Sequence, residues 1–159
     1  MEVRRVVPDE WAELRDVRLR ALADAPYAFA STHAREVTFD EAQWRARIAG
    51  GPWWLARADG VPAGIVAGYG TAEDGDVRHL VAMWVDPAHR GSDAATRLVE
   101  AVCRWADDDG GRVVSLWVAD GNDRARRFYE RLGFTGTGER QPLPSAPEVG
   151  EERFVLHLA

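Results

Sequence analysis

The most informative absences in this sequence are lysine and a second cysteine. The chain contains no lysine, so all twenty of its basic residues are arginines. The single cysteine, Cys103, cannot form an internal disulfide, and its place in a helical pattern favours a small buried side chain over a nucleophile. With one cysteine and four scattered histidines, no spacing is typical of a metal site. We therefore expect no metal.

Long apolar runs and an excess of positive charge are absent as well. No apolar run approaches the ~20 residues that a membrane-spanning helix needs, and no basic segment followed by an apolar one opens the chain. The formal net charge of −6 argues against a concentrated basic face for nucleic acid. We expect a cytoplasmic protein that binds neither a membrane nor a nucleic acid.

The composition that is present suits one domain spanning residues 1–159. A chain of 159 residues can bury roughly 70% of its unfolded surface, which is enough for a proper core. Its hydrophobic content is 46%, and there is no internal repeat, low-complexity tract or linker to mark a boundary. We therefore expect a single globular unit.

Alternation and helical periodicity predict about seven strands and four helices around one core. Strands are expected at 3–7, 53–58, 63–69, 77–85, 113–118, 134–140 and 153–158, with a proline-bearing loop at 141–150. Helices are expected from the N-cap Asp9, from a capping box of Thr38 and Glu41, from residue 94 to about 107, and from 122 to 132. Asp59-Gly60 predicts a tight hairpin turn, while residues 27–35 show no clear pattern. The sum is an α+β fold with a mixed, mostly antiparallel sheet.

One stretch, Val77–Leu98, joins a strand to a helix through a turn of small residues. Strand alternation puts on one face His79, Val81, Met83 and Val85, and on the other Leu80, Ala82 and Trp84. Arg90-Gly91-Ser92 then opens an amphipathic helix, whose first turn leaves backbone N–H groups unpaired at the positive end of the helix dipole. Such a junction can hold a phosphate or diphosphate, although many αβ proteins use the same turn merely to change direction.

A second informative stretch begins at Asn122. Asn122, Ala125 and Tyr129 are spaced i, i+3 and i+7, so they share one helix face, and the small Ala125 allows a close approach between the other two. The pattern N-x-x-A-x-x-F-Y-x-x-x-G-F from Asn122 to Phe134 resembles the acetyl-CoA-dependent N-acyltransferases of the GNAT superfamily. The diphosphate motif of that family, R/Q-x-x-G-x-G/A, falls on residues 90–95, with Asp93 where glycine is usual. The resemblance is specific over residues 80–134.

The resemblance implies a site for acetyl-CoA. In the family the pantetheine arm pairs with the backbone of the central strand, here Met83, Trp84 and Val85, and one backbone N–H there polarises the thioester carbonyl. The diphosphate would be held at the helix start by Arg90, Gly91, Ser92, Asp93, Ala94, Ala95 and Thr96. Asn122 and Tyr129 would lie near the sulfur, with Tyr129 as the general acid toward the departing thiolate.

A base for the proton of the amine is harder to assign. Family members often use a glutamate on the central strand or a water relay, but Val77–Val85 contains no acidic residue. His79 is the one group there that is suited to titrate near neutral pH, so we name it as the second catalytic candidate, although a lone histidine on a strand is often structural. Glu36, from the region that flanks the acceptor cleft in the family, is a weaker candidate.

The expected activity is transfer of an acetyl group from acetyl-CoA to a primary amine of a small molecule or peptide. Direct attack is expected, because no Cys or Ser suited to a covalent intermediate is evident. Without lysine the chain cannot acetylate itself on that residue, and we keep a homodimer open. One alternative is a degenerate member that binds no cofactor productively, because of Asp93, and acts as a ligand sensor or partner module. An unrelated nucleotide-binding protein is the other, but the Walker lysine is missing.

Overall fold

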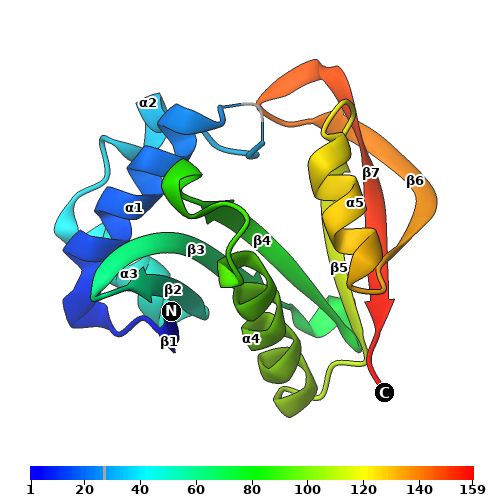
Figure 1. The fold of residues 1–159 in the computed structure, drawn as a ribbon, viewed down its shortest axis with the longest axis horizontal. Helices are drawn as coiled ribbons and strands as arrows, with labels where there is room; N and C mark the ends of the chain where they lie inside the picture. Colours follow the sequence, from blue (N-terminus) through cyan, green and yellow to red (C-terminus); the bar gives the residue numbers. More distant parts are fainter. Residues whose placement is uncertain (27) are drawn as a thin grey trace.

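The computed structural model describes residues 1–26 and 28–159, whose strands form one sheet in the order β1-β2-β3-β4-β5-β7-β6 (Figure 1). The strands are β1 (Glu2–Arg5), β2 (Trp53–Ala58), β3 (Val61–Tyr69), β4 (Val77–Val85), β5 (Val113–Ala119), β6 (Thr135–Leu143) and β7 (Ala146–His157). The α-helices in the described residues are α1 (Trp11–Asp24), α2 (His33–Glu36), α3 (Glu41–Gly50), α4 (Ala94–Asp108) and α5 (Asp123–Arg131). The expected mixed α+β fold is confirmed, with the one-turn helix α2 in addition to the four predicted helices.

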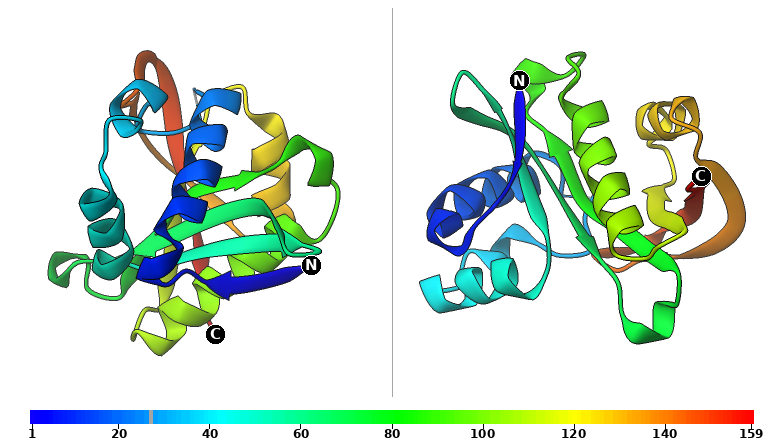
Figure 2. Two further views of the ribbon diagram at one scale, coloured as in Figure 1. Left: turned by 90° about the vertical axis from the view of Figure 1, so that its left-hand side faces the viewer. Right: turned by 90° about the horizontal axis from the view of Figure 1, so that it is seen from below.

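Helices cover both faces of the sheet, and a separate core fills each side. In the right-hand view of Figure 2, α1 and α3 lie on one side of β3 and β4, and α4 and α5 lie on the other. The core on the α1 side includes Leu14, Trp44, Leu55, Ile65 and Trp84. The core on the α4 side includes Val66, Leu80, Leu98, Val114 and Phe134. Neighbouring residues of β3 reach opposite cores because side chains alternate along a strand.

β4 contains a bulge that changes which core its side chains reach. Its register with β3 shifts next to Ile65, which leaves one extra residue on β4. Ala82 has a φ of 60°, in the left-handed region that residues with a Cβ atom rarely adopt. Leu80 and Trp84 consequently reach opposite cores. The prediction that Leu80, Ala82 and Trp84 share one face is wrong, because simple alternation assumes an unbroken pleat.

β4 and β5 run parallel but pair only near their beginnings. The paired positions are Val77 with Val113, Arg78 with Val114, and His79 with Ser115. In the described chain no residue of β5 pairs with β4 after His79, and Figure 1 shows the two strands diverging. The other neighbouring strands in the sheet are antiparallel. The divergence leaves one backbone edge of β4 without a neighbouring strand, and this edge sets the position of the site.

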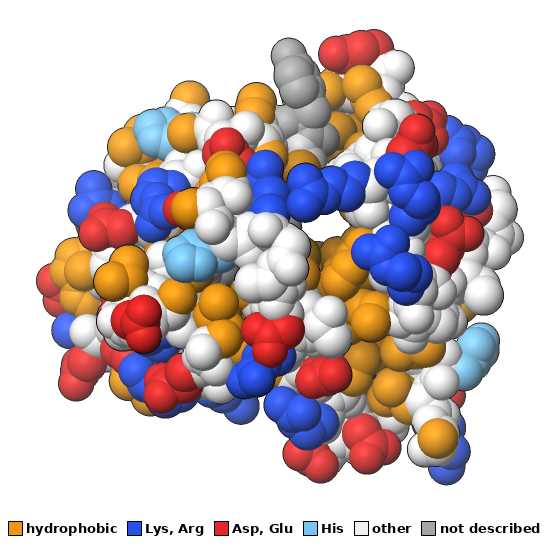
Figure 3. Space-filling model, in the orientation of Figure 1, with side chains coloured by type: hydrophobic (Ala, Val, Ile, Leu, Met, Phe, Trp, Pro, Cys, Tyr) orange, Lys and Arg blue, Asp and Glu red, His pale blue; other side chains and the backbone are white. Residues whose placement is uncertain are grey.

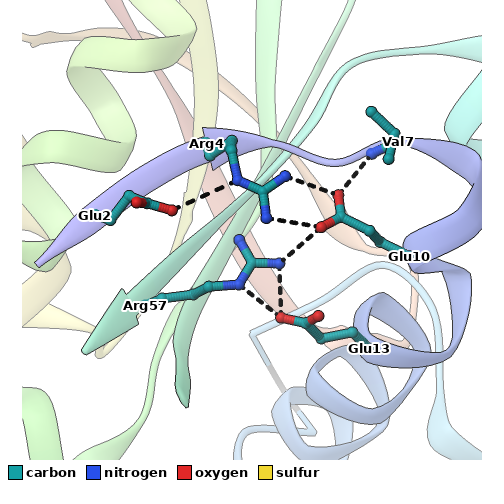
Figure 4. A network of polar contacts seen from close by, with 6 residues as sticks. All are labelled: Glu2, Arg4, Val7, Glu10, Glu13 and Arg57. Atoms are coloured by element: carbon teal, nitrogen blue, oxygen red, sulfur yellow. Dashed lines mark hydrogen bonds and ion pairs between the residues drawn. The ribbon is translucent and has the colours of Figure 1, made fainter. Parts of the chain in front are cut away.

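An arginine–carboxylate network holds the beginning of α1, where the sequence predicted a cap at Asp9. A short 3-10 turn precedes α1, and Asp9 lies in that turn and not at the N-cap. Figure 4 shows Glu10 beside Arg4 and Arg57, with Oε2 at 2.8 and 3.4 Å from their Nη2 atoms. Glu13 also contacts Arg57 at 2.6 Å. We call Arg4, Glu10, Glu13 and Arg57 the edge network, because it ties the edge strand β1 and its neighbour β2 to the beginning of α1.

The predicted capping box of α3 is displaced by two residues. Asp40 is the N-cap, and its Oδ1 accepts a hydrogen bond of 2.8 Å from the backbone N–H of Gln43. The side chain of Gln43 accepts in turn from the Asp40 N–H, also at 2.8 Å. The pairing of Thr38 with Glu41 is therefore wrong. The Thr38 hydroxyl instead donates to the carbonyl of Arg35 at 2.7 Å, which closes the turn after α2.

The two hairpins differ in how well their sequences predict them. Asp59 and Gly60 join β2 to β3 with φ of 52° and 80°, and this predicted tight turn is confirmed. β6 and β7, by contrast, extend through the predicted loop at 141–150, and Leu143 pairs with Ala146 at the tip. The loop prediction is wrong because β6 is an outer strand, where Pro142 is tolerated on a side that needs no hydrogen-bond donor.

Candidate active site

The divergence of β4 and β5 opens into a cavity of about 1250 Å³. Its wall comes from both strands, the turn before α4, α5, the β6–β7 hairpin and the α1–α3 side of the molecule. Figure 3 shows a hollow in this face with arginine side chains along its rim. The charged residues of the wall, among those described, are Arg18, Arg35, Arg47, Arg90, Arg124, Arg131, Glu36 and Glu151. The wall is thus positive in a chain whose net charge is −6.

The end of β4 presents its backbone to this cavity. Met83, Trp84 and Val85 follow the bulge, and all three line the cavity. Because β5 has moved away, an extended ligand can pair with this edge of β4 as another strand would. The carbonyl of Val85 already accepts a hydrogen bond of 3.1 Å from Nε of Arg90.

The turn before α4 brings backbone N–H groups to the cavity. Gly91 has a φ of 87°, which a residue with a Cβ atom adopts only with strain. The Ser92 hydroxyl donates to the carbonyl of His89 at 2.6 Å and accepts from the N–H of Ala94 at 3.3 Å. The predicted residues of this turn that line the cavity are Arg90, Gly91, Ser92, Ala95 and Thr96. A glycine turn at the positive end of a helix is suited to bind an anion.

Arg90 also fixes the turn against α1 and β4. Its Nη2 donates to Oδ2 of Asp24 at 2.8 Å, and the indole N–H of Trp84 donates to the same oxygen at 2.9 Å. These hydrogen bonds, first from Trp84 and then from Arg90, lower the pKa of Asp24. The carboxylate therefore stays ionised and holds the last turn of α1, β4 and the turn before α4 in one arrangement.

Two predicted residues of the turn, Asp93 and Ala94, do not line the cavity. Asp93 occupies the N-cap position of α4, but its side chain makes no capping hydrogen bond. Its Oδ2 instead accepts from Nε of Arg97 at 2.7 Å, one helical turn further on. Ala94 is fully buried in the core below the turn. The side chains of Asp93 and Ala94 therefore do not face the cavity.

α5 supplies the wall opposite the edge of β4. Asn122 is its N-cap and accepts a hydrogen bond of 3.2 Å from the N–H of Ala125. Asn122, Ala125 and Tyr129 all line the cavity, so the structure brings together the face that their spacing predicted. Tyr129 is 7% exposed, and its ring packs edge-on against Phe128 and Phe134. Burial raises the pKa of Tyr129, so its hydroxyl keeps its proton at neutral pH.

His79, the predicted base, lies elsewhere. It does not line the cavity, and its ring stacks on Tyr69 with the ring centres 4.6 Å apart. Its Nε2 lies 3.1 Å from Oδ1 of Asp74, and this contact, together with hydrogen bonds from Thr71, lowers the pKa of Asp74 to about 2. The structure therefore places His79 against Asp74 and Tyr69 at the beginning of β4 and not with Tyr129.

Glu36, the weaker candidate base, lines the cavity but is already engaged. Arg18 donates from Nε and Nη2 to its two oxygens, each at 3.0 Å, and Arg47 donates from Nη1 at 2.7 Å. Burial alone would raise the pKa of Glu36, but these hydrogen bonds outweigh burial and lower it to about 2. Such a carboxylate is a poor proton acceptor at neutral pH, so the suggestion that Glu36 is the base is not supported. We call Arg18, Glu36 and Arg47 the cavity triad.

Glu151 is a cavity residue that the sequence did not reveal. It lies on β7 opposite Ala119 of β5, is 6% exposed, and lines the cavity. Nε2 of Gln141 donates to its Oε1 at 2.6 Å. Burial raises the pKa of Glu151, although the hydrogen bond from Gln141 opposes this. The pattern of the sequence placed Glu151 next to a loop, and only the pairing of β7 with β5 turns it toward the site.

The described residues offer little for metal or thiol chemistry. In the described part of the chain, no three His, Cys, Asp or Glu side chains form a candidate metal site. Cys103 lies outside the cavity wall, and burial raises the pKa of its thiol to about 11, so it stays protonated. Among the described helices, none is long and apolar enough to cross a membrane. The cavity itself offers anion binding, a buried acid and a buried carboxylate.

Curated relatives match only part of this chain. An uncharacterised N-acetyltransferase of Methanocaldococcus jannaschii is 34% identical over 86 residues, which make up 52% of this chain and 38% of that protein. An uncharacterised N-acetyltransferase of Mycobacterium tuberculosis is 37% identical over 79 residues, or 48% of this chain and 51% of that protein. The chain thus spans about half or less of the length of these relatives.

Solved structures match over the whole chain. An acetyltransferase of the GNAT family from Streptococcus pneumoniae has a TM-score of 0.81 at 19% identity and covers 99% of both chains. A proposed acetyltransferase from Salmonella typhimurium, solved with its cofactor acetyl-CoA, has a TM-score of 0.80 at 19% identity and covers 100% of this chain and 94% of its own. At these identities the structures establish the fold alone. A model of the acetyltransferase (GNAT) family matches residues 11–134, more than half of the sequence, and the chain therefore belongs to this family.

Proposed function

We propose that this chain is an N-acetyltransferase that transfers the acetyl group of acetyl-CoA to a primary amine of a small molecule or peptide. One observation carries the proposal: a single cavity joins the turn before α4, the unpaired edge of β4 and the wall of Asn122, Ala125 and Tyr129. A donor with a diphosphate, an extended amide-bearing arm and a thioester needs a separate partner for each of these parts. Membership of the acetyltransferase family supports the same donor.

The residues present fit acetyl-CoA as a co-substrate. The diphosphate would bind in the turn from Arg90 to Thr96 at the N–H groups that make no hydrogen bond to a described residue, which are those of Gly91, Asp93, Ala95 and Thr96. The space beside Gly91 is open, and Arg90 adds positive charge. Asp93 would contribute through its backbone N–H only, because its side chain lies outside the cavity wall, whereas the N–H of Ala94 is already donated to the Ser92 hydroxyl. The amides of the arm would pair with the backbone of residues 83–85, and a β4 N–H would polarise the thioester carbonyl.

Tyr129 is our proposed general acid. The transfer forms a bond between the amine nitrogen and the acetyl carbon and breaks the bond between that carbon and sulfur. The departing thiolate then needs a proton, and the Tyr129 hydroxyl is protonated, buried and on the wall that faces the edge of β4. It makes no hydrogen bond to a described residue that would compete for this proton. Solvent restores the proton after release of the products.

Glu151 replaces His79 as our proposed base. The nitrogen of a neutral amine loses one proton as its bond to carbon forms, and the acceptor of this proton must reach the cavity. Glu151 lines the cavity beside the end of β5, whereas His79 is engaged with Asp74. Burial raises the pKa of Glu151, which makes it a better proton acceptor than an exposed carboxylate. His79 would then act only indirectly, by stacking on Tyr69, which lines the cavity.

The alternative of a degenerate, non-catalytic member depends on Asp93. Its argument was that a carboxylate in the turn repels the diphosphate. The ion pair of Asp93 with Arg97 and its absence from the cavity wall weaken this argument. A cytoplasmic location and a homodimer stay predictions.

Thiol release from acetyl-CoA, measured against a panel of primary amines, tests the proposal. Tyr129→Phe should lower kcat by about ten- to a thousand-fold and leave the affinity for acetyl-CoA near normal. Glu151→Gln should lower kcat by about ten- to a hundred-fold and remove the fall in rate on the acidic side of the pH profile. His79→Gln is the matched control and should keep that profile. No thiol release above the rate without protein for any amine, with no rise in melting temperature on adding acetyl-CoA, would favour the degenerate alternative.

A further inference from the structure

The cavity triad holds more positive charge than its one carboxylate balances. The pKa of Glu36 lies far below neutrality, so its carboxylate is ionised at pH 7, as both guanidinium groups are. Two positive charges therefore share one negative charge, and a net charge of +1 remains. The side chains of Arg18, Glu36 and Arg47 are 6%, 1% and 27% exposed, so water reaches Arg47 in part but hardly reaches Arg18 or Glu36.

Arg18 is the buried member of the triad that carries the surplus positive charge. Its Nη1 is buried and makes no hydrogen bond to any described residue. The carbon of its guanidinium lies 5.0 Å from the centre of the Phe29 ring, which stabilises a cation less than a carboxylate does. A buried cation without full compensation costs free energy in the unliganded protein. An anion that enters the cavity would lower this cost.

Arg47 is the member of the triad whose positive charge a ligand in the cavity can reach. Its guanidinium lies over the rings of Phe39, Trp44 and Trp53, at 5.5, 4.9 and 5.1 Å from their centres, and these contacts fix its position. It donates Nη1 to Glu36, while its Nε and Nη2 make no hydrogen bond to a described residue. The side chain lines the cavity. A guanidinium held in place with unused donors is a ready partner for a carboxylate.

The triad belongs to a different wall from the turn that would bind the diphosphate. Its residues come from α1, α2 and α3, whereas the turn containing Arg90 opens α4 on the other face of the sheet. Ser145, at the tip of the β6–β7 hairpin, donates from its hydroxyl to the carbonyl of Phe29. This contact brings the hairpin that carries Glu151 against the segment after α1. The positive triad and the Glu151 carboxylate therefore line one cavity from separate elements.

We infer that the amine acceptor also carries a carboxylate, as a free amino acid does, and that Arg47 binds this carboxylate with Arg18 behind it. The inference rests on the proposed function, because it names the class of acceptor for the same cavity. The carboxylate of the acceptor balances the surplus charge of the triad, and its amine lies toward Glu151. Arg47 is a specificity residue in this arrangement and takes no part in making or breaking bonds.

The test compares acceptors that differ only in the anionic group: glycine with glycinamide, and phenylalanine with phenylalaninamide. Values of kcat and KM are measured by thiol release from acetyl-CoA for the wild type, Arg47→Gln, Arg47→Lys and Arg45→Gln. Arg45 is the matched control, because it lies on the same helix, pairs with Asp9 and Glu41, and does not line the cavity. Comparing the acid-to-amide ratio between variants cancels the different basicities of the two amines.

The wild type should favour each amino acid over its amide by at least about tenfold in kcat/KM. Arg47→Gln should remove this preference through a higher KM for the amino acid and should leave the amide within about twofold. Arg47→Lys should keep part of the preference, because it retains the charge and loses the fork of donors. Arg45→Gln should keep all of it.

Equal rates for acid and amide in the wild type would overturn the inference and leave the proposed function standing. An equal fall in kcat/KM for the amino acid and for its amide in Arg47→Gln would also overturn the inference and leave the proposed function standing. The wild-type comparison needs no variant, so a failure of Arg47→Gln to fold does not remove the test. If acetyl-CoA raises the melting temperature but none of the four acceptors is acetylated, the inference alone fails. If acetyl-CoA neither binds nor loses its thiol, the proposed function fails.

Discussion

The edge network and the cavity triad both consist of arginines and glutamates, but they differ in the balance of positive and negative charge. In the edge network two arginines, Arg4 and Arg57, meet the carboxylates of Glu10 and Glu13 (Figure 4). In the cavity triad two arginines share Glu36 alone. Both networks contain a buried Nη1 atom, of Arg57 or of Arg18, that makes no hydrogen bond to a described residue.

An unpaired buried nitrogen is therefore not by itself a sign of a binding site. The edge network has its charges balanced and contributes no residue to the cavity wall, so it is complete as a structural tie. The cavity triad has a surplus positive charge and lies on that wall. Burying an unbalanced charge is unfavourable unless a partner compensates it, so the triad, and not the edge network, is the one expected to bind a ligand.

The largest expected effect comes from removing one carboxylate charge from each network. Glu36→Gln leaves the buried guanidinium of Arg18 and the partly buried one of Arg47 without a counter-charge and should reduce the free energy of unfolding by about 3–5 kcal/mol. Glu10→Gln leaves Glu13 beside Arg57 in a more exposed setting and should cost about 1 kcal/mol or less. Urea unfolding at pH 7 measures both values. Equal losses in the two variants would contradict the distinction between a balanced and a surplus network.

A second prediction uses pH to isolate the triad. The pKa of Glu36 is lowered from 4.5 to about 2, so its ionised form stabilises the fold fully above the higher value and progressively less as pH falls toward the lower one. The stability difference between the wild type and Glu36→Gln should therefore shrink by about 2 kcal/mol between pH 6 and pH 3. Urea unfolding across this range gives the measurement. A difference that stays constant with pH would mean that packing, and not charge, explains the loss.

The smallest effect is expected at an exposed pair, Asp93 with Arg97, whose side chains are 55% and 48% exposed. Exposed pairs contribute less than about 1 kcal/mol, so Asp93→Gly should lower the melting temperature only slightly. Its affinity for CoA, measured by titration calorimetry at low salt, should change by less than about fivefold, because Arg97 already offsets the carboxylate. A much larger gain in affinity would restore the view that Asp93 repels the diphosphate.

Predictions from the sequence succeeded where neighbouring residues determine the structure. The hairpin at Asp59 and Gly60 depends on two adjacent residues with positive φ, and the helix predicted from Asn122 begins there because the Asn122 side chain accepts from the N–H three residues on. Predictions from the sequence failed where two neighbouring residues could each cap the same helix. Thr38 and Asp40 are each followed three residues later by a residue that can complete a capping box. Asp40 caps α3 because the Thr38 hydroxyl closes the turn after α2.

Long-range pairing decided the features that periodicity could not indicate. The bulge at Ala82 exists because β4 pairs with β3 in a shifted register, and no residue of β4 signals that shift. Glu151 reaches the cavity because the pairing of β7 with β5 begins two residues before the predicted strand at 153–158. His79 was named as a base from its place on the strand, but stacking on Tyr69 and pairing with Asp74 are contacts outside β4.

The amino-acid pattern was enough to predict the glycine turn before α4 and the shared face of α5, because glycine turns and i, i+3, i+7 spacings act through the nearby backbone. Only the tertiary structure decided how charge is distributed around the cavity. Arg18, Glu36 and Arg47 come from three helices, and each is an ordinary charged residue in its own segment. Packing removed water from them together, and because the interaction between buried charges depends on all of their partners, the surplus arises only when the helices meet.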